Sequence, residues 1–339
     1  MLLMLWATDN LKNTIFLEMP GVNKKQVEAS EIEIAFMANS PSKPHWLRKK
    51  IPTAGHYSEI LATIKEGAIH TVCAEAKCPN QMECFSKGNA TFLLLGPNCT
   101  RRCRFCAVDK YPVQPPDPAE PLRTARAVAR MGVNFCVLTM VTRDDLADGG
   151  AEHIARTIRA IHRECPGVGV EMLISDLAGN HAALQTVLQA GVKVLNHNVE
   201  TVPRLYAAVR PQADYGRSIA LLATSKKLAP QVLTKSGIML GLGEARDEVL
   251  QVMDDLIEAG CQLLTLGQYL APSERHHPVI RYVTPEEFED YKIAAEKRGF
   301  SGVASSPFVR SSYRAGWLYQ NALKSISERT RLPKAKPTP

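Results

Sequence analysis

Six of the nine cysteines in this 339-residue chain fall into two closely spaced groups of three. The first triplet consists of Cys73, Cys78 and Cys84, and the second triplet consists of Cys99, Cys103 and Cys106. Each triplet is one ligand short of the four that an iron–sulfur cluster takes. Three thiolates on one short loop can hold three irons of a 4Fe–4S cube and leave the fourth iron open to a substrate. The spacing therefore predicts two iron–sulfur clusters.

A zinc site is the alternative for the second triplet, with a histidine as the fourth ligand. The nearest histidines in the sequence are His70 and His153, which makes a zinc motif a poor match. The other three cysteines lie within or beside apolar stretches, and they are Cys136, Cys165 and Cys261. We expect these three to be incidental thiols that pack as small hydrophobic side chains.

The overall composition is that of an ordinary globular protein, with 45% apolar and 22% charged residues. The 41 basic and 34 acidic residues leave a formal charge of +7, and no basic stripe interleaved with aromatic residues indicates nucleic-acid binding. No apolar run approaches the length of a membrane span, and the apolar start at 1–6 is too short for a signal peptide. Closely spaced cysteines indicate a reducing compartment, so we expect a cytoplasmic protein.

From residue 91 onward, apolar runs of strand length alternate with helical patterns. The expected strands cover 91–95, 133–141, 168–174, 192–196, 232–240 and 262–266. The expected helices between them include 120–131, 151–163, 181–190, 218–228 and 244–259. This alternation is typical of a parallel sheet in an α/β fold. Six units are too few for a closed eight-stranded barrel, so we expect a partial barrel or an open doubly wound sheet.

Several residues fall at the carboxyl ends of these expected strands, where α/β barrels place their active sites. The second triplet follows the first strand, Gly149 and Gly150 follow the second, and Glu200 follows the fourth. The glycines would let a ligand approach the backbone closely, or they would only turn the chain into the next helix. Arg210 would bind a carboxylate or form a structural ion pair.

The second triplet reads C-x3-C-x2-C directly after the first strand, and it resembles the motif of the radical S-adenosylmethionine superfamily. In that superfamily the open iron binds the amino and carboxylate groups of S-adenosylmethionine. An electron then cleaves the cofactor to methionine and a 5′-deoxyadenosyl radical. The resemblance implies cofactor-binding roles for Gly149, Gly150, Glu200 and Arg210.

The first triplet narrows the resemblance to one family. Its run CAEAKCPNQMEC closely resembles the auxiliary-cluster motif of lipoyl synthases, and Arg310–Tyr313 resembles their RSSY motif. The similarity extends in dispersed stretches from about 44 to 322. In the family, a serine oxygen of RSSY is the fourth ligand of the auxiliary cluster. Motif position favours Ser312 here, with Ser311 as the alternative; without the family, the stretch is only a helix start with serine capping.

The resemblance implies a partial (β/α)6 barrel of the radical S-adenosylmethionine type at 91–300. An N-terminal extension at 44–90 would carry the first triplet, and a C-terminal segment at 301–339 would carry RSSY and a basic tail. Residues 1–43 form a poorly specified leader. The implied reaction inserts two sulfur atoms, at C6 and C8, into a protein-bound octanoyl-lysine, with the auxiliary cluster as sulfur donor. The implied cofactors are two 4Fe–4S clusters and S-adenosylmethionine.

The implied partners are octanoylated lipoyl carrier domains, either E2 subunits of 2-oxoacid dehydrogenases or the glycine cleavage H protein. A reductant such as ferredoxin or flavodoxin and a cluster-repair protein are implied too, whereas no nucleic acid or membrane is expected. Two other hypotheses remain open. One is a radical S-adenosylmethionine enzyme whose first-triplet cluster only transfers electrons, and the other is a non-enzymatic metal-binding scaffold. The sequence identifies no catalytic residue beyond the cluster ligands.

Overall fold

The computed structural model describes residues 42–49, 52 and 55–331 of the chain. The leader expected at 1–43 lies outside the described residues except for its last two positions, and the basic tail after residue 331 lies outside them as well. None of the helices in the described ranges is both long and apolar enough to cross a membrane.

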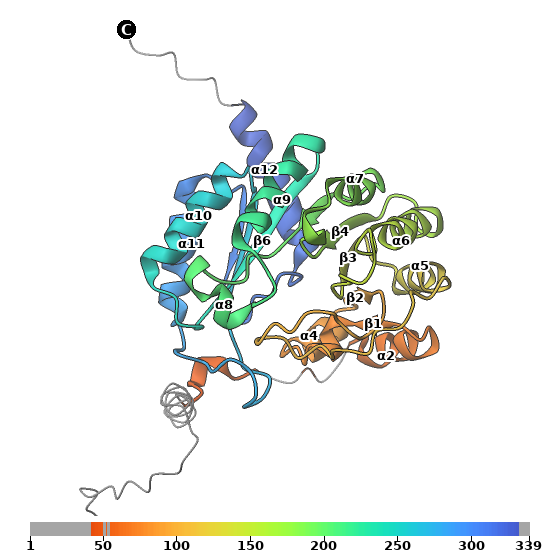
Figure 1. The fold of residues 1–339 in the computed structure, drawn as a ribbon, viewed down its shortest axis with the longest axis horizontal. Coiled ribbons are helices and arrows are strands. Elements are labelled where there is room, and N and C mark those ends of the chain that lie inside the picture. The colour runs from red at the N-terminus through yellow and green to blue at the C-terminus, as the bar shows by residue number, and fades with distance from the viewer. Residues whose placement is uncertain (1–41, 50–51, 53–54, 332–339) are drawn as a thin grey trace, which may run out of the picture. The chain divides into compact units, whose positions relative to one another are not determined.

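A single eight-stranded sheet forms the centre of the described region, and its strands lie side by side in chain order (Figure 1). The strands are β1 (His70–Thr71), β2 (Thr91–Leu94), β3 (Phe135–Met140), β4 (Gly169–Leu173), β5 (Val194–Asn196), β6 (Leu233–Leu240), β7 (Leu263–Gln268) and β8 (Gly302–Ser305). Strands β2 to β8 are parallel, and β1 pairs antiparallel with β2. Among the described strands, β8 pairs with β7 and not with β1, so the sheet is open.

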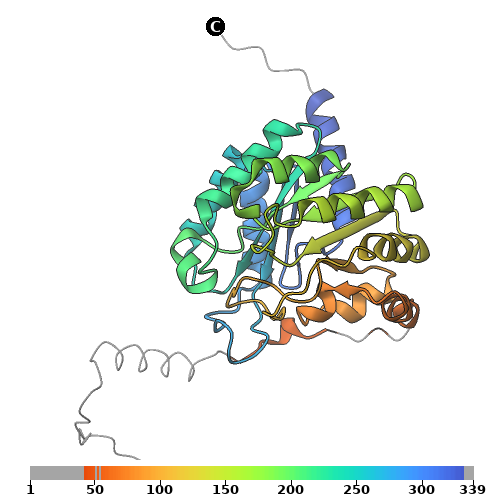
Figure 2. The same cartoon turned by 45° about the vertical axis from the view of Figure 1, so that its right-hand side comes forward.

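Six helices follow strands β2 to β7 in turn and cover the outer face of the sheet (Figures 1 and 2). They are α5 (Glu120–Met131), α6 (Ala151–Glu164), α7 (His181–Gln189), α9 (Tyr215–Leu228), α10 (Arg246–Glu258) and α11 (Pro285–Arg298). Since a doubly wound sheet has helices on both faces, this arrangement is that of a partial barrel. The first triplet lies on or between two short helices that precede the barrel, α3 (Val72–Glu75) and α4 (Gln81–Ser86).

The strands are buried as parallel strands must be when both of their faces are covered. In β2, for example, Phe92, Leu93 and Leu94 are each at most 3% exposed. One apolar core packs β2 to β5 against α5, α6 and α7, and a second packs β6 to β8 against α10 and α11.

Helix α12 (Ala315–Arg331) packs at the amino ends of the strands. Its Leu318 and Ala322 belong to one apolar cluster with Val194, Leu233 and Leu263, which are the first residues of β5, β6 and β7. Apolar side chains therefore fill this end of the barrel, and the polar loops gather at the carboxyl ends of the strands.

The six expected strands are confirmed as β2 to β7, and the six strand–helix units form the expected partial barrel. Strands β1 and β8 were not predicted from the sequence. Strand β1 has only two residues, which is too short to show an alternating pattern, and β8 is built mainly from small residues, Gly-Val-Ala-Ser. Each forms by pairing with a longer neighbouring strand, β1 with β2 and β8 with β7.

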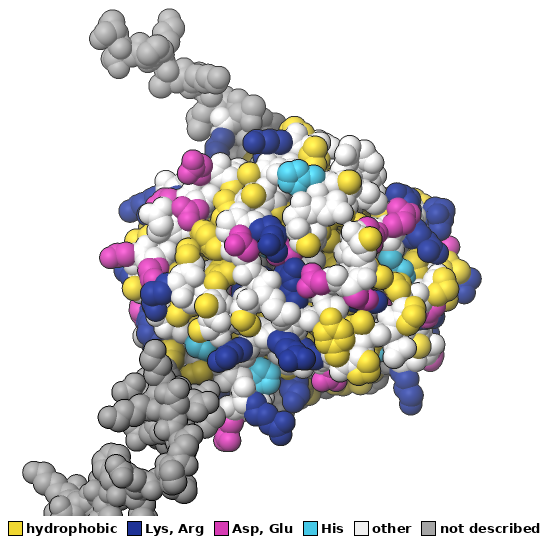
Figure 3. Space-filling model, in the orientation of Figure 1, with side chains coloured by type: hydrophobic (Ala, Val, Ile, Leu, Met, Phe, Trp, Pro, Cys, Tyr) yellow, Lys and Arg dark blue, Asp and Glu magenta, His cyan; other side chains and the backbone are white. Residues whose placement is uncertain are grey.

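The charges are mixed on the face of the molecule shown in Figure 3. There, lysine and arginine side chains are scattered among acidic and apolar side chains. The formal charge of +7 is therefore not gathered into one basic stripe on this face.

Candidate active site

The second triplet lies on the loop that leaves β2, at the carboxyl edge of the sheet. Its three thiols are partly buried. The Cys99 amide donates a hydrogen bond to the carbonyl of Asp109 at 2.8 Å, and the Cys106 amide donates to the carbonyl of Cys103 at 3.2 Å. These backbone bonds close the loop on itself.

Arg101, between the first two cysteines of the second triplet, ties this loop to two neighbouring strands. Its buried guanidinium donates from Nε and Nη2 to the Asp144 carboxylate at 2.8 and 2.9 Å. Nη2 also donates to the buried Asp176 at 2.6 Å. Asp144 follows β3 and Asp176 follows β4. Charge-assisted hydrogen bonds of this kind are strong and directional, so they fix the position of the loop over the strand ends.

The three thiols of the second triplet are close enough to influence one another electrostatically. The pKa of the Cys106 thiol is raised to about 11, mainly by burial and in part by the Cys103 and Cys99 thiols. Burial also raises the pKa of Cys103, which feels the nearby charges of Arg210 and Glu200. In the metal-free protein the Cys103 and Cys106 thiols are protonated at neutral pH, and bound iron would have to displace those protons.

Glu200 and Arg210 lie beside the second triplet, from the segment that follows β5. Burial raises the pKa of Glu200, whose carboxylate accepts a hydrogen bond from the Asn198 amide at 3.1 Å. Arg210 donates from Nη1 to the carbonyls of Asn198 and Val199 at 3.1 and 3.0 Å. Nη1 also donates to the Tyr206 hydroxyl at 3.2 Å, so none of the hydrogen bonds of Arg210 goes to a carboxylate of the described residues. Its buried Nε has no partner among those residues.

Buried polar atoms without a partner are concentrated in this segment. Among the described residues, four of the five such side-chain atoms are Asn196 Oδ1, His197 Nε2, Thr201 Oγ1 and Arg210 Nε. Buried polar groups normally have a hydrogen-bond partner, so the segment is suited to a polar ligand such as the amino-acid portion of S-adenosylmethionine. Burial lowers the pKa of His197 to about 4, with Arg210 contributing, so the imidazole is neutral at physiological pH.

Gly149 and Gly150 form the turn between β3 and α6. Both have left-handed backbones, with φ of +61° and +89°. The Asp148 carboxylate accepts hydrogen bonds from the amides of Gly150 and Glu152, each at 2.9 Å, and so caps the helix. A Cβ on Gly150 would lie 2.4 Å from Cδ1 of Leu95. This turn therefore starts helix α6, and its left-handed backbone and its close packing on Leu95 explain why residue 150 is a glycine.

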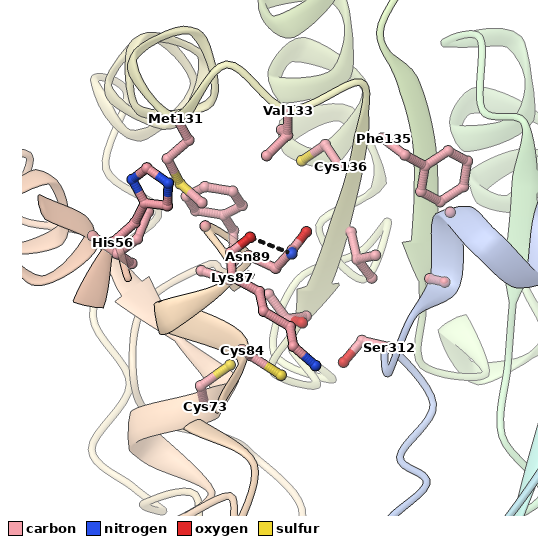
Figure 4. A pocket seen from close by; sticks show the side chains of 18 of the residues that line it. His56, Cys73, Cys84, Lys87, Asn89, Met131, Val133, Phe135, Cys136 and Ser312 are labelled. Carbon is pink, nitrogen blue, oxygen red and sulfur yellow. Dashed lines mark hydrogen bonds between the residues drawn. The ribbon is translucent and has the colours of Figure 1, made fainter. Parts of the chain in front are cut away.

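The first triplet lines a cavity of about 930 Å³ together with Ser312. Cys73 and Cys84 lie on one wall of this cavity, and Ser312 faces them from the segment before α12 (Figure 4). The three cysteines come from the extension that precedes the barrel, whereas the serine comes from the opposite end of the chain. The fold alone brings these four side chains to one space.

The thiols of the first triplet also influence one another. The pKa of Cys84 is raised to about 12, mainly by burial and in part by Cys73 and Cys78. Burial raises the pKa of Cys73 to about 11, again with a contribution from Cys78. No three His, Cys, Asp or Glu side chains of the described residues are grouped so as to hold a metal ion. In a 4Fe–4S cube each thiolate binds a different iron, so the three thiols surround the cube instead of meeting at one ion.

The two candidate serines differ in their surroundings. Ser311 Oγ accepts a hydrogen bond from Asn196 Nδ2 at 2.7 Å and donates to Asn198 Oδ1 at 3.0 Å. Ser312 lines the cavity of the first triplet. The hydroxyl of Ser311 is therefore engaged by the barrel, while that of Ser312 faces the cysteines.

The polar side chains that hold these sites in place were not predicted from the sequence. Arg101 lies inside the C-x3-C motif, but spacing alone does not tell an anchor from a spacer. Asn196 and His197 end a buried strand, and polar residues in such a position could have flagged them. Glu83, next to Cys84, gave no signal because two of its three partners, Lys49 and Tyr313, come from segments far away in the sequence.

The three remaining cysteines are not part of either triplet, although Cys136 and Cys165 pack in the same apolar cluster as Cys99 and Cys106. Cys136 and Cys261 are buried, and Cys165 is partly buried. Cys136 also lines the cavity of the first triplet, but the charged form of its thiol is disfavoured by burial and then by Cys165.

Comparison with known proteins gives a consistent result along the chain. Residues 93–256 match the family described as the radical SAM superfamily. The chain is 51% identical over 280 residues to the lipoyl synthase of Desulfotalea psychrophila, which covers 83% of this chain and 94% of that protein. It is 54% identical over 279 residues to the lipoyl synthase of Geobacter sulfurreducens, which covers 82% of this chain and 91% of that protein.

Solved structures support the fold. Methylornithine synthase (PylB) is similar with a TM-score of 0.51 at 13% identity, over 86% of this chain and 83% of that chain. The FeFe-hydrogenase maturase HydG from Carboxydothermus hydrogenoformans is similar with a TM-score of 0.50 at 14% identity, over 88% of this chain and 69% of that chain. At such low identity these similarities show the architecture alone.

Proposed function

The chain belongs to the lipoyl synthase family of radical S-adenosylmethionine enzymes, and on that premise we propose that it inserts sulfur at C6 and C8 of a protein-bound octanoyl-lysine. One observation carries the proposal. The first triplet and Ser312 line one cavity, although the serine lies more than 200 residues further along the chain. The second triplet occupies a separate loop at the carboxyl edge of the sheet. Two cluster sites with different ligand sets are what a sulfur-inserting enzyme of this family needs.

The proposed ligands are divided between the two sites. Cys99, Cys103 and Cys106 would hold the cluster that binds S-adenosylmethionine, and the first triplet with Ser312 would hold the auxiliary cluster. When bound, these groups supply a 5′-deoxyadenosyl radical, which can remove hydrogen from an unactivated C–H bond, and the sulfur that replaces it. Ser312 is preferred to Ser311 because Ser311 already bonds to two asparagines of the barrel.

The residues beside the second triplet would bind and orient S-adenosylmethionine. Arg210 is suited to its carboxylate, since the Nε of the guanidinium is buried without a partner and guanidinium pairs well with carboxylates. Glu200 is suited to a positively charged or hydroxyl group of the cofactor. The backbone at Gly149 and Gly150 would approach the methionyl amino group. Burial of these residues keeps water away, which a reactive radical requires.

The proposed partners follow from the substrate. Octanoylated lipoyl carrier domains of 2-oxoacid dehydrogenase E2 subunits or of the glycine cleavage H protein would bring the octanoyl-lysine. A reductant such as ferredoxin or flavodoxin would supply electrons, and a cluster-repair protein would restore the consumed cluster. The close spacing of the six cysteines in the two triplets is typical of metal binding and supports a cytoplasmic, reducing location.

Two variants test the division of labour between the sites. Parent, Cys99→Ala, Cys73→Ala and the control Cys165→Ala would be reconstituted anaerobically and analysed for iron and sulfide. Each would then receive S-adenosylmethionine, dithionite and an octanoyl-lysyl peptide. We expect each ligand variant to lose about half of its iron. Cys73→Ala should still make 5′-deoxyadenosine, and only the parent and Cys165→Ala should make thiolated peptide.

Other outcomes would point to the alternatives. If Cys73→Ala still formed thiolated peptide, the first triplet would not carry the sulfur donor. If sulfide of the auxiliary cluster stayed constant during turnover of the parent, an electron-transfer role would replace the sulfur-donor role. If the parent cleaved no S-adenosylmethionine, the protein would be a metal-binding scaffold.

A further inference from the structure

Three consecutive residues between β8 and α12 are directed to three different parts of the molecule. Ser311 bonds to the barrel interior, Ser312 lines the cavity of the first triplet, and Tyr313 bonds to α4. Ser312 therefore lies between two anchors. Its position depends on both of them, because a single residue gives the chain little freedom to compensate.

The first anchor is a buried polar network in the barrel. Asn196 Nδ2, which bonds Ser311, also donates to the Glu171 carboxylate at 2.9 Å. Glu171 is paired with Lys235 at 2.8 Å, and both side chains are fully buried. Breaking a buried ion pair is costly, so this end of the network is rigid.

The second anchor joins Tyr313 to the helix that carries Cys84. The Tyr313 hydroxyl donates to Glu83 Oε1 at 2.9 Å. Glu83 also accepts hydrogen bonds from Lys87, which directly follows α4, and from Lys49. The three donors fix the orientation of the carboxylate immediately beside Cys84.

Lys49 and Asn80 add a second connection between the same two segments. Asn80 Nδ2 donates to the carbonyl of Phe308 at 2.7 Å, and its Oδ1 accepts from Lys49 Nζ. Lys49 Nζ lies 4.8 Å from the centre of the Phe308 ring and 5.8 Å from that of Tyr313. A cation within about 6 Å of an aromatic ring is attracted to its face. One lysine thus contacts both sides of the junction.

We infer that Tyr313, through Glu83 and Lys49, is a positioning residue that sets the Ser312 oxygen against the auxiliary cluster. The inference rests on the proposed function for Ser312 and adds the residues that hold it. A serine oxygen is an exchangeable ligand of iron, unlike the three thiolates. Its retention depends on how firmly its backbone is held, and the Tyr313–Glu83 bond holds it from the side of the cysteines.

The test measures how fast the auxiliary cluster releases iron to a chelator. Ser312→Ala, Tyr313→Phe and the control Tyr319→Phe would each be made in a Cys99→Ala background, so that only auxiliary iron is counted. Tyr319 is a matched control because it lies on α12 and packs its ring on Phe135. We expect Tyr313→Phe to release iron roughly tenfold faster than the background protein, since a hydrogen bond to a charged group is lost. Tyr319→Phe should match the background.

A spectroscopic readout separates positioning from general loosening. The iron-57 Mössbauer spectrum of the auxiliary cluster should change in Tyr313→Phe toward that of Ser312→Ala, while thermal unfolding of the cluster-free protein changes little. The Tyr313→Phe chain with Cys99 restored should still make 5′-deoxyadenosine, because its second triplet is intact. If Tyr313→Phe matched the background protein in iron release and in its spectrum while Ser312→Ala released iron faster, the positioning role of Tyr313 would be overturned. The ligand assignment of Ser312 would stand. If Ser312→Ala also matched the background, the ligand assignment would fall and the inference with it.

Discussion

The two cysteine sites are built in different ways. The second triplet occupies one eight-residue loop, and its main anchors, Asp144 and Asp176, follow the two next strands in the chain. The site of the first triplet joins segments from opposite ends of the chain. The hydrogen bond between Asn80 and Phe308 spans 228 residues, and that between Tyr313 and Glu83 spans 230.

The two sites therefore depend on different parts of the fold. The loop of the second triplet is anchored to residues that follow β3 and β4, so its geometry forms when these barrel strands form. The site of the first triplet is complete only after residues 73–84 and residues 308–313 have docked. Under the proposed function, a ligand set assembled from distant segments would be able to open without unfolding the barrel, as a consumed cluster would require.

The largest expected effect breaks the second site alone. Arg101→Met would leave the buried Asp176 without its closest cation and should lower the free energy of unfolding by about 3–5 kcal/mol. Reconstituted protein should lose the iron of the second triplet and keep that of the first. Arg102→Met, at an exposed neighbouring position, is the control and should stay within about 0.5 kcal/mol of the parent in urea titration. Equal losses in both variants would show that Arg101 is not the anchor.

A smaller effect separates backbone geometry from packing behind the second site. Gly150→Ala combines a left-handed φ with a Cβ that would clash with Leu95, and should cost about 3 kcal/mol. Gly132→Ala has the same backbone problem, but no atom lies within 4 Å of its Cβ, so it should cost only about 1–2 kcal/mol. Urea denaturation of both variants gives the difference. Identical costs would mean that the Leu95 contact relaxes freely.

The buried His197 should make the free energy of unfolding depend on pH. Its pKa is lowered to about 4 by burial, so between about pH 6.5 and pH 4 the unfolded chain binds a proton that the folded chain does not. Stability is therefore fully present above pH 6.5 and falls as the pH drops through this window. On going from pH 7.5 to pH 5, His197→Gln should lose about 2 kcal/mol less stability than the parent. Urea titrations of the two cluster-free proteins at both pH values measure these losses. Equal losses of stability in the parent and in His197→Gln would contradict the prediction.

The smallest effect concerns the fourth thiol of the large cavity. Cys136→Ala should leave the iron content and the thiolated peptide yield unchanged and cost about 1 kcal/mol, because Cys136 packs as a small apolar side chain. Iron and sulfide analysis beside Cys84→Ala, which should lose the auxiliary cluster, checks this. Loss of iron in Cys136→Ala would make Cys136 a rival to Ser312 as the fourth ligand.

Features that repeat or cluster along the chain were predictable from the sequence. The spacing of both triplets was readable because ligands on one loop must lie within a few residues of each other. The six strands β2 to β7 were readable because buried strands are continuous apolar runs. The loop of the second triplet could be placed at the carboxyl edge for the same reason, since the strand before it, at 91–95, was plain.

How distant segments meet could be seen only in the folded protein. The different surroundings of Ser311 and Ser312 depend on Asn196, Asn198 and the cavity walls, which neighbouring positions in a sequence do not reveal. The anchors Glu83 and Arg101 were likewise invisible, because an ion pair or hydrogen bond has no period along the chain. Local patterns record which face of an element is buried, whereas long-range polar contacts exist only once the elements have packed.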